Sequence, residues 1–255
     1  MTSPADPVVL RLRAAGVVFA EEEADLLRSA VGDLDALVAR RVAGEPLEPL
    51  LGWAAFDGLR VPVAPGVFVP RLRTELLARA AARLAAPGDL VLDLCCGTAA
   101  VGLAIATRVP GVVVHAEDIE PPAVATARRT LAPVGGTVWQ GDLFAALPDR
   151  LQGRFAVIAA NAPYVPTERI ADMPREARDF EPRVALDGGE DGLDVHRRVT
   201  AAAAAWLAPG GALLIETGRT QAAWTALLLE QAGLAASVES DDEVDGTVAI
   251  GRLPR

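Results

Sequence analysis

An asparagine and a tyrosine follow an apolar segment of the chain. Asn161-Ala162-Pro163-Tyr164 comes directly after residues 155–159, and Tyr164 is the only tyrosine in the sequence. A tetrapeptide that contains proline is usually an ordinary turn at the end of a strand. If the apolar segment belongs to a parallel sheet, however, this turn lies at the carboxyl edge, where open α/β sheets bind ligands. We therefore expect Asn161, Ala162, Pro163 and Tyr164 to contact a ligand.

A loop of small residues follows another apolar segment, residues 90–94, which contains Asp93. The loop comprises Cys95, Cys96, Gly97, Thr98 and Ala99. Small side chains let a ligand lie against the backbone N–H groups at the start of the helix that follows. The loop is either a cofactor loop or a plain strand-to-helix turn. A dinucleotide-binding loop has the pattern G-x-G-x-x-G, of which this loop keeps one glycine.

A carboxylate follows the next apolar segment, residues 112–116, about one strand–helix–strand unit further on. At the tip of a second strand, Asp118 is placed to accept two hydrogen bonds from ribose hydroxyls. Its alternative role is to cap the helix that starts near Pro121. Asp142-Leu143, after the third strand, combines a polar group with an apolar wall and suits an adenine ring.

A parallel sheet would bring these residues together. From residue 90 onward short apolar runs alternate with helical patterns, which predicts a parallel sheet with helices on both faces. The predicted strands are residues 90–94, 112–116, 137–139, 155–159 and 212–215, and the predicted helices are residues 99–109, 123–131, 195–207 and 221–231. The alanine run 201–205 is placed on a helix that ends at Pro209-Gly210-Gly211. Residues 236–239 and 247–252 have no helix between them and predict a final antiparallel pair.

Two further segments precede this pattern. Residues 1–43 form the predicted N-terminal helical segment, with two or three short helices. Residues 44–73 carry five prolines among alternating apolar residues, which predicts a hairpin or linker. Residues 74–255, which begin with a helix at 74–84, form the predicted ligand-binding domain.

Composition excludes several classes of protein. The chain has 255 residues, of which 51% are hydrophobic, so it is not disordered and can bury one sizeable core. Its 24 basic residues are all arginines and face 34 acidic residues, giving a net charge of −10. Proteins held mainly by nucleic-acid phosphates are expected to be basic, so direct nucleic-acid binding is disfavoured.

The cysteines and the apolar runs indicate the cellular compartment in which the protein is expected. Cys95 and Cys96 are neighbours and cannot join distant segments, and metal-ligand spacing is missing, so we expect neither disulfides nor a metal site. No uncharged run reaches the roughly 20 residues that a membrane helix needs, and residues 1–7 lack the pattern of a signal peptide. We expect a cytoplasmic protein that does not bind membranes.

The order of these segments resembles a class I S-adenosylmethionine-dependent methyltransferase. Asn161-Ala162-Pro163-Tyr164 is a variant of the Asn-Pro-Pro-Tyr signature of enzymes that methylate planar amide or amino nitrogens. Within that class the chain is similar, along nearly its whole length, to the release-factor glutamine methyltransferases, the HemK/PrmC family. The other segments that carry this resemblance are residues 41–47, 51–52, 56–59, 69–71 with 74–75, 181–186 with 188–189 and 192–193, and 216–218 with 221.

The resemblance implies a fold and a branch of the family. The implied fold is α/β, a Rossmann-like seven-stranded class I methyltransferase sheet with a small N-terminal helical segment and a hairpin linker. The family usually has glycines where Cys95 and Ala99 stand, and proline where Ala162 stands. These departures indicate a PrmC-related branch.

The resemblance also assigns roles. The loop from Cys95 to Ala99, with Asp93, would hold the methionine portion of S-adenosyl-L-methionine; Asp118 would hold the ribose, and Asp142 with Leu143 the adenine. Asn161 borders both cofactor and acceptor. The Asn161 side-chain oxygen and the Ala162 carbonyl would accept the two N–H hydrogens of an amide, with Tyr164 beside the amide plane. Catalysis would then rest on positioning and electrostatics, without a strong base.

The implied function is methyl transfer to the side-chain amide nitrogen of a glutamine in a protein, either a release factor or a related protein. Three alternatives stay open: a nucleic-acid N(6)-adenine methyltransferase, a small-molecule N-methyltransferase, and a non-catalytic protein that binds S-adenosylmethionine. The oligomeric state is not predicted. Five arginines are expected near the cleft, where they could steer an acceptor: Arg71, Arg73, Arg175, Arg178 and Arg183.

Overall fold

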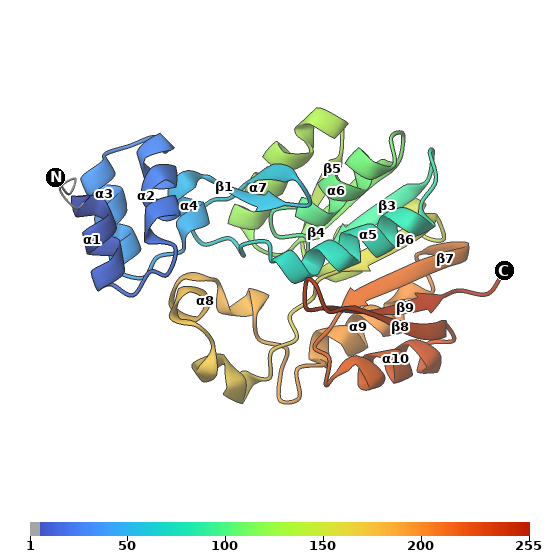
Figure 1. Cartoon of the computed structure of the whole chain (residues 1–255). Coiled ribbons are helices and arrows are strands. Elements are labelled where there is room, and N and C mark those ends of the chain that lie inside the picture. Colours follow the sequence, from blue (N-terminus) through green and yellow to red (C-terminus); the bar gives the residue numbers. More distant parts are fainter. Residues whose placement is uncertain (1–5) are drawn as a thin grey trace.

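The computed structural model describes residues 6–255 and contains a helical N-terminal part, a β-hairpin and a larger α/β part (Figure 1). Residues 1–5, the start of the predicted N-terminal segment, lie outside the described residues. The N-terminal part contains three short helices, α1 (Pro7–Ala14), α2 (Ala20–Ser29) and α3 (Leu34–Val42). Aspartates cap two of them, because Asp6 accepts from the Val8 amide at 3.0 Å and Asp33 from the Ala36 amide at 3.1 Å. The helices share a small apolar core of their own.

A short helix and a hairpin connect this part to the sheet. The hairpin pairs β1 (Trp53–Phe56) with β2 (Leu59–Pro62), as predicted. Its turn, Asp57-Gly58, has positive φ at both residues, the conformation that suits two-residue hairpins. The helix α4 (Leu47–Leu51) was not predicted, because its prolines indicated a linker. Pro46 precedes this helix and Gly52, with φ of 80°, ends it, so both residues act at its boundaries.

The central sheet has seven strands, which confirms the predicted Rossmann-like fold. The strands are β3 (Leu90–Leu94), β4 (Val113–Asp118), β5 (Thr137–Gln140), β6 (Phe155–Ala160), β7 (Leu207–Glu216), β8 (Ala235–Asp241) and β9 (Gly246–Arg252). Their order is β5-β4-β3-β6-β7-β9-β8. The first five are parallel, whereas β9 is antiparallel to both β7 and β8, as expected for the final pair. The carboxyl ends of β3, β4 and β6 therefore meet at one edge.

Helices cover both faces of the sheet (Figure 1). One face packs α5 (Glu75–Leu84), α6 (Ala100–Arg108) and α7 (Pro121–Leu131), and the other packs α9 (Asp194–Ala203) and α10 (Ala222–Gln231). Alternate residues of one strand serve the two cores: Val157 of β6 belongs to the first and Ile158 to the second. Both are fully buried, which explains why β6 is apolar throughout.

The predicted end of the helix at 195–207 was wrong. The helix α9 stops at Ala203, and Pro209-Gly210-Gly211 lies inside β7 instead of ending a helix. Leu207 pairs with Phe155, and the register then shifts so that Ala212 pairs with Val157. A Cβ at Gly211 would lie 2.8 Å from the Phe155 carbonyl oxygen, so this position needs glycine. The two glycines therefore form a bulge in a strand.

An irregular segment between β6 and α9 completes the fold. It contains the one-and-a-half-turn helix α8 (Arg175–Phe180), which lies beside the N-terminal helices in Figure 1. Short 3₁₀ helices occur at η1 (Leu72–Thr74), η2 (Ala132–Val134), η3 (Leu143–Ala146), η4 (Asp149–Leu151), η5 (Thr167–Asp172) and η6 (Arg183–Ala185). Within residues 6–255, no helix has the length and apolar character needed to cross a membrane.

Candidate functional site

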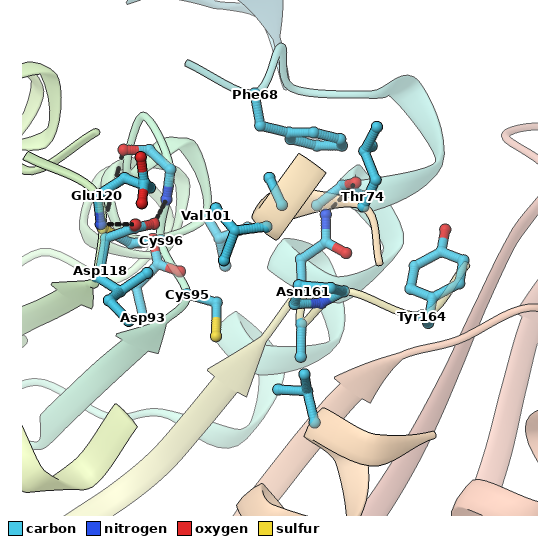
Figure 2. A pocket seen from close by; sticks show the side chains of 18 of the residues that line it. Phe68, Thr74, Asp93, Cys95, Cys96, Val101, Asp118, Glu120, Asn161 and Tyr164 are labelled. Atoms are coloured by element: carbon cyan, nitrogen blue, oxygen red, sulfur yellow. Dashed lines mark hydrogen bonds between the residues drawn. The ribbon is translucent and has the colours of Figure 1, made fainter. Parts of the chain in front are cut away.

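The main pocket lies at the carboxyl edge of β3, β4 and β6. Twelve of the residues singled out in the sequence line it: Asp93, Cys95, Cys96, Gly97, Thr98, Asp118, Asp142, Leu143, Asn161, Ala162, Pro163 and Tyr164. Ala99 does not line the pocket, because it is fully buried behind the loop at the start of α6. Figure 2 shows Asp118 and the two cysteines at one end and Asn161 with Tyr164 at the other.

The loop after β3 is tied to the end of β4. The Gly97 amide donates to Asp118 Oδ2 at 2.8 Å, and the Cys96 amide donates to the Glu117 carbonyl at 2.9 Å. The loop turns through positive φ at Cys95 (56°), Gly97 (54°) and Ala99 (58°). Two of these positions are therefore held by residues that do not favour this conformation, and they are the two where the family usually has glycine.

Asp118 does not cap the helix that follows. It accepts from the Glu120 amide at 2.9 Å as well as from Gly97, but the N-cap position of α7 is Glu120, whose side chain makes no capping bond. The structure therefore does not support helix capping, the alternative role that the sequence suggested for Asp118. Burial raises the pKa of Asp118, and its two amide partners act in the opposite direction.

Two further carboxyl groups lie buried next to Asp118. Asp93 accepts from the Gly102 amide at 2.8 Å, and burial raises its pKa to about 8. Glu117 is 1% exposed, and burial together with the Asp118 charge raises its pKa to about 8 as well. Within residues 6–255, no arginine forms an ion pair with any of the three. This end of the pocket is acidic and lacks a counter-ion, so it suits a positively charged ligand.

Glu117 was not among the candidate residues, although it lines the pocket. The signal was present in the sequence, because an acidic residue inside an otherwise apolar strand is costly to bury without a reason. Asp142 and Leu143 follow β5, the strand next to β4, and also line the pocket. Asp142 pairs with Arg198 at 2.6 Å on the rim, while Leu143 is buried and offers an apolar wall.

The other end of the pocket has a different character. Asn161 Nδ2 donates to Thr74 Oγ1 at 3.3 Å, and the Tyr164 hydroxyl donates to Glu216 Oε1 at 3.2 Å. Figure 2 shows the Asn161 amide pointing toward Thr74, with Phe68 above. Burial, and then the Glu216 charge, raise the pKa of Tyr164, so its hydroxyl keeps its proton. Thr74 and Phe68 both come from the segment before the sheet: the resemblance placed Thr74 near the cleft, with a helix cap as its alternative role, whereas Phe68 was not a candidate.

The five arginines do not gather at the cleft. Arg71 and Arg73 line the pocket, whereas the other three do not. Arg175 and Arg178 pair with Asp179, and Arg183 pairs with Asp187. Each of these three arginines forms an ion pair with an aspartate close to it in sequence, so the expected basic cluster does not form.

Comparisons with known proteins identify the family of this chain. Residues 91–180 match the family model of a methyltransferase domain. The chain is 41% identical over 188 residues to the release factor glutamine methyltransferase of Geobacter sulfurreducens, which covers 73% of this chain and 65% of that protein. The corresponding protein of Streptomyces coelicolor is 40% identical over 197 residues, covering 74% of this chain and 70% of that protein. The chain belongs to the release factor glutamine methyltransferase family.

Family membership confirms the predicted resemblance and identifies S-adenosylmethionine as the methyl donor. The acidic end of the pocket fits this cofactor, which carries a positive sulfonium and an ammonium group. The chain spans about two thirds of the length of these family members.

Two other similarities bear on fold and substrate. The 4-amino-L-phenylalanine/4-methylamino-L-phenylalanine methyltransferase of Streptomyces pristinaespiralis is 37% identical over 223 residues, covering 80% of this chain and 76% of that protein. A crystal structure of a methyltransferase from Pyrococcus furiosus has a TM-score of 0.59 at 15% identity, over 78% of this chain and 90% of that one, which supports the fold.

Proposed function

We propose that this chain transfers the methyl group of S-adenosylmethionine to the side-chain amide nitrogen of a glutamine in a protein, a peptide chain release factor or a related protein. The observation that supports this is the place of Asn161 and Ala162. They follow β6 in the same pocket as the acidic end, so an acceptor bound there would face the cofactor. Release factors act in the cytoplasm, and the proposal places this chain there too.

The cofactor would be held at the acidic end. Asp93 and the loop residues Cys95 to Thr98 would contact the methionine portion, Asp118 the ribose, and Leu143 with Asp142 the adenine. Bound S-adenosylmethionine supplies an electrophilic methyl group on a positively charged sulfur. Asp93, Glu117 and Asp118, which form no ion pair with an arginine, would offset that charge. Their attraction to it is stronger in a partly buried site than in water.

The acceptor would be held at the Asn161 end. An amide nitrogen is a poor nucleophile, because its lone pair is delocalised into the carbonyl group. The Asn161 Oδ1 and the Ala162 carbonyl oxygen can each accept one N–H of the acceptor, which fixes the nitrogen toward the methyl group and increases its electron density. Tyr164 would pack beside the amide plane. Holding two reactants in line is a large part of such catalysis.

A second candidate is methylation of an aromatic amine on a free amino acid. The similarity to the 4-amino-L-phenylalanine enzyme, over 80% of this chain, favours it. An aryl amine presents a planar NH₂ group to Asn161 and Ala162 much as a glutamine amide does. It differs in size and in carrying a free carboxylate and ammonium group.

One experiment separates these functions. The purified chain is incubated with methyl-labelled S-adenosylmethionine and, in separate reactions, a release factor, 4-amino-L-phenylalanine or an adenine-containing oligonucleotide. We expect the release factor to gain the mass of one methylene group on a single glutamine, and the Asn161→Ala variant to lose this activity. Labelling of the amino acid alone would establish the second candidate, and labelling of the oligonucleotide alone would refute both. Tight cofactor binding without any labelling would indicate a non-catalytic protein.

A further inference from the structure

Thr74 occupies the N-cap position of α5 but does not cap that helix. Threonine is a preferred N-cap residue because its hydroxyl can accept from an amide of the first turn. Here no such bond forms. The Thr74 side chain is buried, and its oxygen instead accepts from Asn161 Nδ2, 87 residues further along the chain. The hydroxyl is therefore used at the pocket instead of at the helix.

The direction of the Asn161 amide decides what the pocket can hold. A side-chain amide has an accepting oxygen at one end and a donating NH₂ at the other. Only the oxygen can accept an N–H from an acceptor nitrogen. If the amide were turned over, its NH₂ would face the NH₂ of the acceptor, and two donors would be left without partners. The bond to Thr74 occupies Nδ2 and leaves Oδ1 for the acceptor.

The Thr74 hydroxyl can itself donate or accept, so something must set its direction. The candidate is Glu216, the last residue of β7, which is 1% exposed. Its carboxylate pairs with Arg73, the residue next to Thr74, and the Thr74 hydroxyl counters the upward shift that burial gives to the pKa of Glu216. An ionised carboxylate can only accept, so a hydroxyl beside it directs its hydrogen toward it.

Two other contacts favour the ionised form of Glu216. The Arg73 guanidinium lies 3.5 Å away and favours the ionised form, as does the hydrogen bond from the Tyr164 hydroxyl. Within residues 6–255, Oε2 of Glu216 is buried and has no hydrogen-bond partner, so this oxygen is free to accept a hydrogen bond. A Thr74 hydroxyl whose hydrogen is turned toward this carboxylate would present a lone pair to Asn161.

We propose that Thr74 and Glu216 are positioning residues that set the polarity of the acceptor site. The Glu216 carboxylate orients the Thr74 hydroxyl, the hydroxyl oxygen holds Asn161 Nδ2, and Asn161 Oδ1 is thereby turned toward the acceptor N–H. The same carboxylate orients the Tyr164 hydroxyl. This inference rests on the proposed function, because it assumes that the acceptor presents an NH₂ group to Asn161.

The kinetic test uses variants that keep side-chain size. Thr74→Val removes the hydroxyl, and Thr74→Ser keeps it. The matched control is Thr126→Val, at a fully buried threonine of α7 whose hydroxyl donates to the Pro122 carbonyl away from the pocket. An unpaired donor at the acceptor site corresponds to a loss of roughly tenfold to a hundredfold in kcat. We expect this loss in Thr74→Val, recovery to within a few fold in Thr74→Ser, and no loss in Thr126→Val.

Two readouts separate positioning from loss of structure. Thr74→Val should leave the Kd for S-adenosylmethionine and the melting temperature near those of wild type while kcat falls. Glu216→Gln should also lower kcat, because its NH₂ end can donate to Thr74 and remove the fixed direction. The losses of the two variants should not add in the double variant, since both break one chain of contacts. A Thr74→Val enzyme that keeps its kcat within twofold would overturn the proposal, as would additive losses.

A spectroscopic measurement gives an answer even if no acceptor is methylated. The side-chain NH₂ signals of Asn161 are assigned in a ¹⁵N–¹H spectrum of the whole chain by their loss in Asn161→Asp. We expect one hydrogen of the pair to exchange slowly in wild type and Thr74→Ser, and rapidly in Thr74→Val and Glu216→Gln. Equal exchange in all four proteins would refute the contact chain itself. Slow exchange in a wild-type protein that methylates no acceptor would instead count against the proposed function alone.

Discussion

Arg71 and Glu181 join two segments that lie 110 residues apart and border the same pocket. One guanidinium nitrogen of Arg71 donates to both carboxylate oxygens of Glu181, at 2.6 and 2.7 Å. The Val69 amide donates to the same carboxylate at 3.1 Å. The Glu181 side chain is almost fully buried, whereas Arg71 is partly exposed and lines the pocket. This pair therefore fixes the segment before the sheet against the segment after α8.

Arg71→Ala should destabilise the fold by about 2 kcal/mol, because it leaves a buried carboxylate without its cation. Burial already raises the pKa of Glu181 while Arg71 opposes that shift, so the variant should have a still higher pKa. A carboxyl group whose pKa is raised by folding does not destabilise the folded protein at acidic pH, because it is protonated in both the folded and the unfolded state. The destabilisation grows as the pH rises.

Urea unfolding at acidic and at mildly alkaline pH checks this prediction, and the loss should be larger at the higher pH. Arg169→Ala is the control, because Arg169 pairs with Asp172 on the surface and should contribute less than about 1 kcal/mol. A loss that is the same at both pH values would show that the Glu181 charge is not its cause.

The affinity for S-adenosylmethionine should increase with pH. The pKa values of Asp93 and Glu117 are both about 8 without a ligand, so both groups are largely protonated at neutral pH. A cation bound beside them favours their ionised forms, so binding releases protons and strengthens up to about tenfold per pH unit for each proton released. The increase should level off above pH 8.

Calorimetric titrations with S-adenosylmethionine and S-adenosylhomocysteine at several pH values measure this effect. The second ligand lacks the sulfonium charge and should show the weaker pH dependence. Glu117→Gln removes one titrating group and should flatten the curve for S-adenosylmethionine. Identical curves for both ligands would mean that these carboxyl groups do not respond to the sulfonium.

Cys95→Gly should stabilise the protein. Cys95 has a φ of 56°, a conformation that costs a residue with a Cβ roughly 1 kcal/mol and costs glycine almost nothing. Its side chain lies at the pocket and is only partly buried, so little packing is lost. The control is Ala104→Gly inside α6, which should lose about 1 kcal/mol because glycine is a poor helix former. A lower unfolding midpoint for Cys95→Gly would contradict the expectation that the backbone at Cys95 is strained.

Local pattern was sufficient to predict most of the fold and the edge at which the site lies. β6 is apolar throughout because both of its faces are covered, and β3 is apolar except for Asp93, which lines the pocket. Asn161 follows β6 at the carboxyl edge as its position predicts. Errors arose where one residue type has two uses. Pro46 and Pro49 suggested a linker around α4, and Gly210-Gly211 suggested a helix end where a strand bulges.

The acceptor end of the pocket was harder to predict, because long-range contacts build it. Thr74, Asn161 and Glu216 are far apart in sequence, and the residues around Thr74 do not show that its hydroxyl accepts from Asn161 instead of capping α5. The pairing of Arg71 with Glu181 is of the same kind. A sequence shows which side chains can act, whereas their partners depend on how the chain folds back on itself.

Arg41 connects the N-terminal helices to α8, which lies in the irregular segment that follows Asn161–Tyr164. Its guanidinium donates to the two oxygens of Glu23 in α2 at 2.6 and 3.0 Å, to the Glu45 carbonyl at 3.0 Å, and to Glu176 of α8. The Arg41 side chain is 10% exposed, so these contacts are largely shielded from water. A planar fork is needed to reach three partners at once, which a lysine ammonium does not provide.

Arg41→Lys and Arg41→Ala should therefore both loosen this junction, with a loss of about 3 kcal/mol for the alanine variant because the largely buried Glu23 is left without a cation. Hydrogen exchange followed by mass spectrometry should show faster exchange in α2, α3 and α8 together, with the central sheet unchanged. The adjacent Arg40 is the control: it is more exposed and pairs with Glu45, so Arg40→Ala should cost less than about 1 kcal/mol and leave α8 protected. If exchange in α8 stays slow in Arg41→Ala, then α8 is held by contacts other than the one to Arg41.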